Sequence, residues 1–413
     1  MARKMRDSGV EWIGEVPEGW KVNLIGTFYS QRSEKVSDRD YAPLSVTMKG
    51  VLPQLSTVAK TDDGDNRKLI KKGDFAINSR SDRRGSCGIS EYDGSVSLIN
   101  TILMPRGEMD PRYYNWLFHT EAFADEFYKW GHGIVDDLWT TRWSEMKRIQ
   151  IVAPPLPEQR RIADYLDEKC AAIDGAVGEL KRGIEDCKAW KKAIIFEAVT
   201  GKANVLAASA CAKATADKKS AKVAKRQMRD RGIPWIGEIP EGWEVSRVKY
   251  ICKIQNGQDP KTTGDIPVYG SGETSFKTCG EYKEGPAVLL GRKGATLHIP
   301  HYIESRYWNV DTAFDVHMKG SHCLKWFYYL AVCFDYRQYI SQTTLPGMTQ
   351  TNYNNMSIPL PSRLEQQAIA DFLDEKCAAI DALVAEKEKL ITDLEAYKKS
   401  LIFELVTGKR EVA

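Results

Sequence analysis

The sequence lacks the features that mark membrane, secreted and zinc-binding proteins. In 413 residues there is no run of about 18 apolar residues, so no membrane-spanning helix is expected. The opening stretch, MARKMRDSGVEWIG, has no apolar segment of the signal-peptide type. Nine cysteines are scattered without a Cys-x-x-Cys pair, which argues against a disulfide framework or a zinc module. We therefore expect a protein of the reducing cytoplasm.

Catalytic motifs are also missing. The chain has no G-x-x-x-x-G-K-[ST] phosphate loop, so ATP-driven chemistry is not indicated. Its only Pro-Pro pair, Pro154–Pro155, lacks the Asn/Asp and aromatic neighbours of an adenine methyltransferase, and no Pro-Asp dipeptide of a metal-dependent nuclease occurs. His298 and His301 are separated by Pro300, which prevents a helical metal-binding pair. We predict no catalytic residue and no metal site.

Positive charge is concentrated in one segment. The net charge is +3, and residues 202–231 contain nine Lys/Arg and two Asp, or +7. The remainder therefore sums to 3 − 7 = −4. Binding to nucleic acid would thus need local basic patches or basic partners, because no global positive field exists.

What the chain does contain is a duplication. MRDSGVEWIGEVPEGW (Met5–Trp20) returns as MRDRGIPWIGEIPEGW (Met228–Trp243), identical at 12 of 16 positions and shifted by 223. EQRRIADYLDEKCAAID (Glu158–Asp174) and FEAVTGK (Phe196–Lys202) return with a shift of 207. The segments between the boxes, 21–155 and 244–361, show little similarity. One frame carrying two different inserts predicts one scaffold that presents two distinct recognition surfaces.

The inserts and the repeated segments have different patterns. Short β-branched runs bounded by Gly, Asp and Pro, such as Gly73–Ser79, alternate with helical stretches near 111–130 and 322–334, so each insert is predicted to be a mixed α/β domain. Prolines near 155 and 361 precede two long periodic helices. The predicted boundaries are 1–155 and 228–362 for the two domains, 156–202 and 363–413 for the two helices, and 203–227 for an Ala/Lys-rich linker.

Apolar residues recur at heptad spacing along both helices. A seam of this kind over about 40 residues favours pairing of the two copies with each other over packing on their own domains. The predicted pairing residues are Leu166, Ile173, Val177, Leu180 and Ile184 in the first helix, and Leu373, Ile380, Val384, Ile391 and Leu394 in the second.

Two polar loops in each insert carry side chains suited to DNA. Arginine can fork onto guanine, and Gln can read adenine, while Ser and Thr can meet phosphates or bases. The first loop of each pair is SRSDRRGS or GRKGATLH, and the second contains a Thr-Thr pair ahead of the return to the helix. A solvated turn is the alternative for any single residue. The candidate DNA contacts are Ser79, Arg80, Arg83, Arg84, Thr140, Thr141 and Arg142 in the first insert, and Arg292, Lys293, Thr343, Thr344, Thr349 and Gln350 in the second.

The repeated WIGEIPEGW-type box, the PLPEQ…IADYLDEK…ID helix start and the FE-x-VTGK helix end resemble the specificity subunit of type I restriction–modification systems. The resemblance covers essentially the whole chain. It implies two globular mixed α/β (α+β) target recognition domains joined by two long antiparallel coiled-coil helices, in a pseudo-two-fold internal repeat.

The resemblance also implies partners. These are double-stranded DNA, two methyltransferase subunits and, in the restricting complex, restriction subunits. S-adenosylmethionine, ATP and Mg would be bound by those partner subunits, and no cofactor by this chain. The expected role is recognition of an asymmetric bipartite DNA target, with the two domains held at a fixed spacing. Alternatives are a specificity portion with residual methyltransferase or nuclease activity, which would need the missing motifs, and a coiled-coil scaffold without DNA, which would not explain the inserts.

Overall fold

The computed structural model describes residues 3–54, 64–133, 139–207, 226–272, 274–339 and 346–412. The chain forms two compact units, one of residues 1–180 with 389–413 and the other of residues 181–388. Each unit holds one globular domain together with a portion of each long helix. Within the described part of the chain, no helix combines the length and apolarity needed to cross a membrane.

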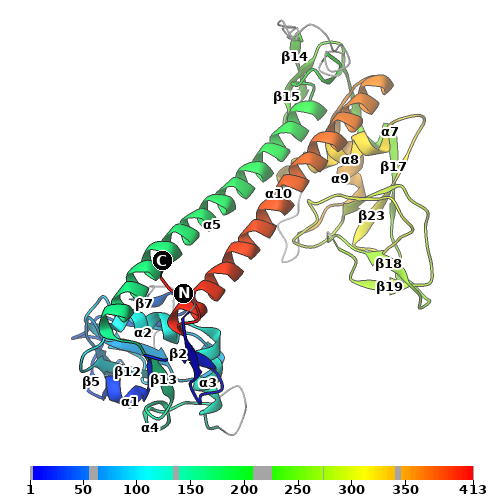
Figure 1. The fold of residues 1–413 in the computed structure, drawn as a ribbon. Helices are drawn as coiled ribbons and strands as arrows, with labels where there is room; N and C mark the ends of the chain where they lie inside the picture. Colours follow the sequence, from blue (N-terminus) through cyan, green and yellow to red (C-terminus); the bar gives the residue numbers. More distant parts are fainter. Residues whose placement is uncertain are drawn as a thin grey trace, which may run out of the picture. The chain divides into compact units, whose positions relative to one another are not determined.

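The first domain is built around an antiparallel four-stranded sheet with the strand order β10-β9-β12-β4 (Figure 1). A three-stranded sheet, β11-β8-β5, and the hairpin β6-β7 lie in the same domain. The strands are β1 (Met5–Asp7), β2 (Glu15–Pro17), β3 (Lys21–Leu24), β4 (Tyr29–Arg32), β5 (Lys35–Val36), β6 (Leu44–Thr47), β7 (Gly50–Pro53), β8 (Arg67–Ile70), β9 (Phe75–Asn78), β10 (Cys87–Ile89), β11 (Gly94–Val96), β12 (Asn100–Pro105) and β13 (Gln150–Ala153). The helices are α1 (Ile25–Phe28), η1 (Ser81–Arg83), α2 (Pro111–Phe118), α3 (Glu121–Lys129) and α4 (Trp143–Met146).

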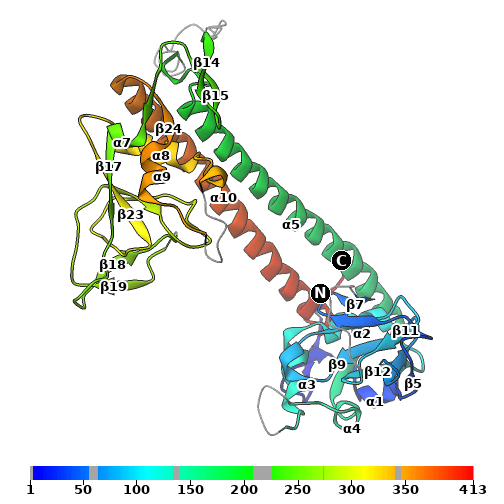
Figure 2. The same ribbon diagram turned by 180° about the vertical axis from the view of Figure 1, so that it is seen from behind.

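The second domain repeats this plan (Figure 2). Its antiparallel four-stranded sheet has the order β21-β20-β23-β17, which matches β10-β9-β12-β4 strand for strand. A three-stranded sheet, β19-β18-β22, contains a parallel pair. The strands are β14 (Met228–Ile233), β15 (Gly237–Pro240), β16 (Glu244–Arg247), β17 (Cys252–Asn256), β18 (Ile266–Tyr269), β19 (Lys277–Cys279), β20 (Ala287–Gly291), β21 (His301–Ile303), β22 (Trp308–Asn309), β23 (Ala313–Met318) and β24 (Ser357–Leu360). The helices are α7 (Val248–Ile251), α8 (Leu324–Val332), η3 (Tyr336–Gln338) and α9 (Gln350–Asn355).

The predicted mixed α/β class is confirmed for both inserts, with one difference in detail. The expected helix over 111–130 is two helices, because Thr120 starts a new one by accepting a hydrogen bond from the Phe123 N–H at 3.2 Å. The turn lets both helices place aromatic rings in one core. Phe118, for example, stacks 4.5 Å from Phe123 and 5.0 Å from Phe75, measured between ring centroids.

The 16 additional residues of the first insert fall in two places. The residue numbers of equivalent strands differ by 223 between β4 and β17, by 213 between β12 and β23, and by 207 between β13 and β24. Ten extra residues (223 − 213) therefore lie between β4 and β12, in the region of the second sheet and the β6-β7 hairpin. Six more (213 − 207) lie between β12 and β13, where the nine-residue α3 takes the place of the three-residue η3.

The two long helices are α5 (Leu156–Val199) and α10 (Arg363–Val406), each of 44 residues or about 66 Å at ~1.5 Å per residue. They run antiparallel. In the first unit Lys398 Nζ lies 2.6 Å from the Asp174 carboxylate, and in the second unit Lys191 Nζ lies 2.7 Å from that of Asp381. Since Asp174 is equivalent to Asp381 and Lys191 to Lys398, the two pairs repeat one contact. The expected pair of long antiparallel helices is confirmed.

The predicted seam residues are buried or half-buried, but they do not all serve the same purpose. Seven of the ten are buried, and Leu180, Val384 and Leu394 are half-buried. Leu373, near the start of α10, belongs to the hydrophobic core of the second domain together with Trp326 and Phe327. The first part of the α10 seam therefore packs on the domain that precedes α10 in the chain. The heptad pattern had favoured pairing with the other helix instead.

Candidate nucleic-acid interface

In the first domain the structure brings together the two loops that the sequence singled out. Arg80 and Thr140 form an isolated antiparallel β-bridge. The Thr141 N–H donates to the Ser79 carbonyl at 3.0 Å, and the Ser81 N–H donates to the Trp139 carbonyl at 3.0 Å. These backbone bonds hold the two loops side by side on one surface of the domain.

The second domain joins its two loops by the same backbone bonds. Lys293 and Gly347 form the bridge, the Met348 N–H donates to the Arg292 carbonyl at 2.8 Å, and the Gly294 N–H donates to the Pro346 carbonyl at 3.0 Å. Arg80 is thus the structural equivalent of Lys293. The frame is conserved between the halves while every side chain on it differs.

This equivalence corrects the alignment suggested by the Thr-Thr pairs. The counterparts of Thr140 and Thr141 are Gly347 and Met348, four positions beyond Thr343 and Thr344. Thr343 and Thr344 themselves lie outside the described residues. The two Thr-Thr dipeptides are therefore at non-equivalent positions in the sequence.

The four predicted arginines of the first joined loops differ in exposure. Arg83 and Arg84 are exposed, Arg142 is exposed at the start of α4, and Arg80 is half-buried. Ser79 and Thr141 are buried instead. The Ser79 hydroxyl lies 2.8 Å from that of Thr101, and the Thr141 hydroxyl donates to the Phe127 carbonyl at 2.8 Å. Contrary to expectation, the side chains of Ser79 and Thr141 fix the loops and do not face a ligand.

In the second domain Lys293 is exposed and Arg292 half-buried. Thr349 is the N-cap of α9, where its hydroxyl accepts from the Asn352 N–H at 3.0 Å. Gln350 donates its amide N–H to the Ile254 carbonyl at 2.5 Å. Thr349 and Gln350 therefore already have intramolecular partners, and reading adenine would require the Gln350 amide to leave its carbonyl.

Carboxylates accompany the arginines of these loops. Asp82 lies 3.2 Å from Arg80, Asp125 pairs with Arg84, and Asp311 lies 3.5 Å from Arg292. All three pairs are at least partly exposed, and such pairs contribute only about 0–1 kcal/mol. These pairs therefore do little to hold the arginines in place.

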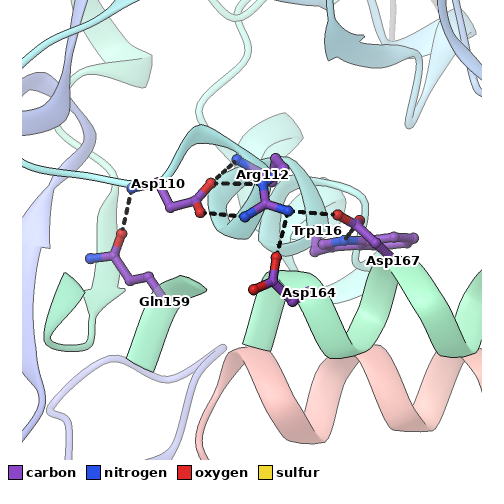
Figure 3. Close-up of polar contacts among 6 residues, drawn as sticks. All are labelled: Asp110, Arg112, Trp116, Gln159, Asp164 and Asp167. Carbon is purple, nitrogen blue, oxygen red and sulfur yellow. Dashed lines mark hydrogen bonds and ion pairs between the residues drawn. The ribbon is translucent and has the colours of Figure 1, made fainter. Parts of the chain in front are cut away.

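Each domain is anchored to its long helix by a buried glutamine that was not predicted from the sequence, and Figure 3 shows the one in the first domain. Gln159 Oε1 accepts from the Asp110 N–H at 2.9 Å, and its Nε2 donates to the Pro154 carbonyl at 2.8 Å. In the second domain Gln366 accepts from the Cys323 N–H and donates to the Pro361 carbonyl, each at 3.0 Å. Both glutamines belong to the Glu-Gln pair that is repeated at the start of each long helix, and this repetition could have identified them from the sequence.

A charged contact reinforces this anchor in the first domain. The Arg112 guanidinium lies 2.8 Å from Asp110 and 2.7 Å from Asp164, and Trp116 Nε1 donates to Asp167 at 2.8 Å (Figure 3). The hydrogen bond to Asp110, followed by that to Asp164, raises the pKa of Arg112 above its ordinary value. The acidic positions of the IADYLDEK motif therefore orient the domain on the helix.

The second domain uses the equivalent acid with different partners. Asp374, the counterpart of Asp167, accepts from the Tyr329 hydroxyl at 2.6 Å and lies 3.0 Å from Lys325 Nζ. Burial, together with the hydrogen bond to Asp374, raises the pKa of the Tyr329 hydroxyl. The acid is thus common to both repeats, while the domain surface that meets it is not.

A second repeated contact secures the tryptophan boxes. The Trp20 ring donates to Glu158 at 2.9 Å, and Arg3 lies 2.6 Å from the same carboxylate. In the second repeat Arg226 lies 2.8 Å from Glu365, and Trp243 donates to that carboxylate at 3.2 Å. Arg3 and Arg226 are related by the box shift of 223, so the duplication extends two residues ahead of the quoted box.

In each unit the VTGK sequence at the end of one repeat's long helix packs against the tryptophan box of the other repeat. A Cβ on Gly408 would lie 2.5 Å from Pro17 and 3.0 Å from Trp20. A Cβ on Gly201 would lie 2.4 Å from Pro240 and 2.9 Å from Trp243. The end of the second repeat thus docks on the first box, and the end of the first repeat on the second box.

Comparison with known proteins gives a consistent result. Residues 240–392 match the family model for the type I restriction modification DNA specificity domain. The chain is 25% identical to the type I restriction enzyme MjaVIII specificity subunit of Methanocaldococcus jannaschii, covering 96% of this chain and 94% of that protein. It is 24% identical to the putative MjaX specificity subunit of the same organism, covering 97% and 96%.

Two solved structures share the fold. A chain from a study of complex assembly and conformational transition in a type I R-M system superimposes with a TM-score of 0.69 at 14% identity, covering 95% of this chain and 98% of that one. The HsdS subunit from Thermoanaerobacter tengcongensis gives a TM-score of 0.54 at 15% identity, covering 96% and 98%.

Proposed function

Because the chain belongs to the family of type I restriction–modification specificity subunits, we propose that its two domains read the two parts of one DNA target. The observation that carries this proposal is the pair of joined loops, built on the same backbone bonds in both domains and bearing different side chains. Arg83 and Lys293 are exposed on these loops. Protein symmetry is mirrored in the site it reads, so a pseudo-symmetric frame with unlike readers corresponds to an asymmetric bipartite target.

The long helices act as the spacer in this proposal. Each of α5 and α10 contributes to both units, and the two helices could not slide along one another without breaking repeated contacts such as Lys398 with Asp174. Readers that dock in successive major grooves are about one helical turn apart, or ~34–36 Å. We propose a spacer of about this length between the two half-sites.

We propose that the chain divides at the limits predicted from its sequence. Target recognition domains of residues 1–155 and 228–362 are followed by α5, which begins at Leu156, and α10, which begins at Arg363. The second domain opens with β14 at Met228. Repeat helices over 156–202 and 363–413 and a linker over 203–227 complete the division, although most of the linker lies outside the described residues.

The chain is proposed to act without catalysis of its own, in the cytoplasm. Two methyltransferase subunits would supply S-adenosylmethionine binding, and restriction subunits would supply ATP- and Mg-dependent cleavage. Among the residues that the structure describes, no group of three or more His, Cys, Asp or Glu side chains is placed to hold a metal ion. Incubating the purified chain with DNA and labelled S-adenosylmethionine tests the assignment, and methyl transfer by the chain alone would refute it.

Substitution of a loop arginine tests the recognition role. Arg83→Ala, in a complex assembled with methyltransferase subunits, should relax one base position of one half-site and weaken binding roughly 5- to 150-fold if Arg83 makes a bidentate base contact. A phosphate contact would instead weaken all sequences alike and lower the salt slope by about 1. Arg39→Ala removes an exposed arginine outside the two loops and is the control. Unchanged binding by Arg83→Ala would contradict a role for this loop.

A further inference from the structure

The loop that connects β18 to β19 exposes an aromatic ring beside a cation. Phe276 is 59% exposed, and the Lys277 ammonium lies 5.4 Å from its ring centroid. An exposed apolar residue is by itself ordinary on a protein surface. The position of this one relative to the recognition loops makes it informative.

The β18–β19 loop lies against the first recognition loop of the second domain. The Ser271 hydroxyl donates to the Lys293 carbonyl. A Cβ on Gly294 would lie 3.2 Å from Ser271 Oγ, and one on Gly272 would lie 4.0 Å from Thr296 Oγ1. Three loops therefore meet at this surface, of which sequence analysis identified two.

Gly270 lies between the Phe276 ring and Thr312, and the backbone of Thr312 is bonded to that of Arg292. A Cβ on Gly270 would lie 3.6 Å from the Phe276 ring and 2.8 Å from Thr312 Oγ1. The Thr312 carbonyl accepts from the Arg292 N–H at 2.8 Å. A side chain at position 270 would crowd Thr312, so glycine suits the place where the backbone passes between Thr312 and the Phe276 ring.

We propose that Phe276 and Lys277 form a third DNA-contact element of the second domain, in which the ring reads a thymine and the ammonium binds a phosphate. The inference rests on the proposed function. Apolar contact with the thymine methyl group is an established way of reading a base in the major groove, and phenylalanine is one of the residues that make it. Neutralising a backbone phosphate requires an adjacent cation, which Lys277 supplies.

The first domain offers the same combination next to its own recognition loop. Met48, 71% exposed, and Lys49 lie at the turn between β6 and β7. Met48 lines a groove of about 770 Å³ together with Arg84. The hairpin also packs on β10, since a Cβ on Gly88 would lie 2.6 Å from the Gly50 Cα. An apolar side chain followed by lysine beside the arginine loop is therefore a feature of both domains.

The chain provides a matched control pair in Lys249 and Tyr250. Tyr250 is 65% exposed, and the Lys249 ammonium lies 5.1 Å from its ring centroid. Both residues directly precede β17, whose first residue, Cys252, pairs with Met318 at the end of β23. The recognition loop follows Gly291, which pairs with Ala313 at the start of β23. The control thus has the same chemistry at the other end of the sheet.

The test uses the complex assembled with methyltransferase subunits and the target that genome-wide methylation mapping assigns to it. Phe276→Ala should make one A·T position of the second domain's half-site degenerate and weaken binding to the intact target about 10-fold or more. Replacing that thymine with uracil should weaken binding by the unaltered complex and leave Phe276→Ala unaffected. Lys277→Ala should reduce the slope of log K against log salt by about 0.9. Tyr250→Ala and Lys249→Ala should change neither property.

Three outcomes would overturn the inference. The first is an unchanged target and affinity for Phe276→Ala, and the second is a loss of affinity that the uracil substitution does not reproduce in the unaltered complex. The third is an equal loss for Tyr250→Ala. Phe276→Gln, with its unfolding temperature measured, serves as a second variant in case the alanine variant folds poorly. The proposed function fails separately, if exchanging the whole second insert leaves the target unchanged.

Discussion

The two glycines of the VTGK helix ends provide a quantitative test of how each unit is closed. Gly201 and Gly408 both have φ of +74° and both lie against a proline of the opposite box. An alanine in the left-handed region costs roughly 1–2 kcal/mol. Its Cβ would also lie 2.4 Å from Pro240 or 2.5 Å from Pro17, a distance that forces a ring or the backbone to move. Overpacking of this kind costs about 1–3 kcal/mol, so we expect about 2–5 kcal/mol in total.

Gly408→Ala should therefore destabilise the first unit and Gly201→Ala the second, as measured by the denaturant midpoints of the full chain and by hydrogen exchange at the affected box. Gly175→Ala is the matched control, because Gly175 lies within α5 with nothing within 4 Å of its added Cβ. This control should stabilise the chain by about 0.5–1 kcal/mol. If Gly408→Ala were as stable as the control, or opened the second unit and not the first, the docking of each helix end on the opposite box would be refuted.

Three further predictions follow from the contacts. Gln159→Leu leaves the Asp110 N–H and a proline carbonyl without their bonds, so it should destabilise the first domain by about 2–5 kcal/mol in chemical denaturation, and Gln366→Leu should act alike in the second domain. Burial lowers the pKa of His119 in the folded chain. The first domain should therefore lose stability as the pH falls below about 6.5, the ordinary pKa of a histidine in the unfolded chain, because unfolding then lets this histidine take up a proton. His119→Val should flatten the dependence of stability on pH, and an unaltered slope would contradict this. Adding one heptad within 173–194 together with one at the equivalent place in α10 should lengthen the spacer in methylation maps and preserve both half-sites, whereas altered half-site bases with an unchanged spacer would refute the ruler function.

The frame of the fold was predictable from the sequence because it is repeated. Two copies of the same box, helix start and helix end imply equivalent surroundings, and the shifts of 223 and 207 located the boundaries of the inserts. Heptad spacing then predicted two long helices. It could not show that Leu373 covers its own domain, since a seam residue looks the same whichever apolar surface it meets.

The candidate site was predictable only in part. Loops rich in arginine and hydroxyls were predicted from the sequence as DNA contacts and stay a prediction, whereas the joining of two of them through Arg80 and Thr140 is a structural finding. The burial of Ser79 and Thr141 depends on tertiary partners that leave no mark on the local sequence. The β18–β19 loop was not predicted, because its contact with the GRKGATLH loop, from Ser271 to the Lys293 carbonyl, joins residues that are distant in sequence.

Exchange of a single insert tests whether the two domains read DNA independently on one frame. Residues 21–155 would be replaced by the corresponding insert of another specificity subunit, and methylation would be mapped across the genome of cells that carry the complete system. One half-site should change, while the other half-site and the spacer remain as they were. A change in both half-sites, or in neither, would contradict it.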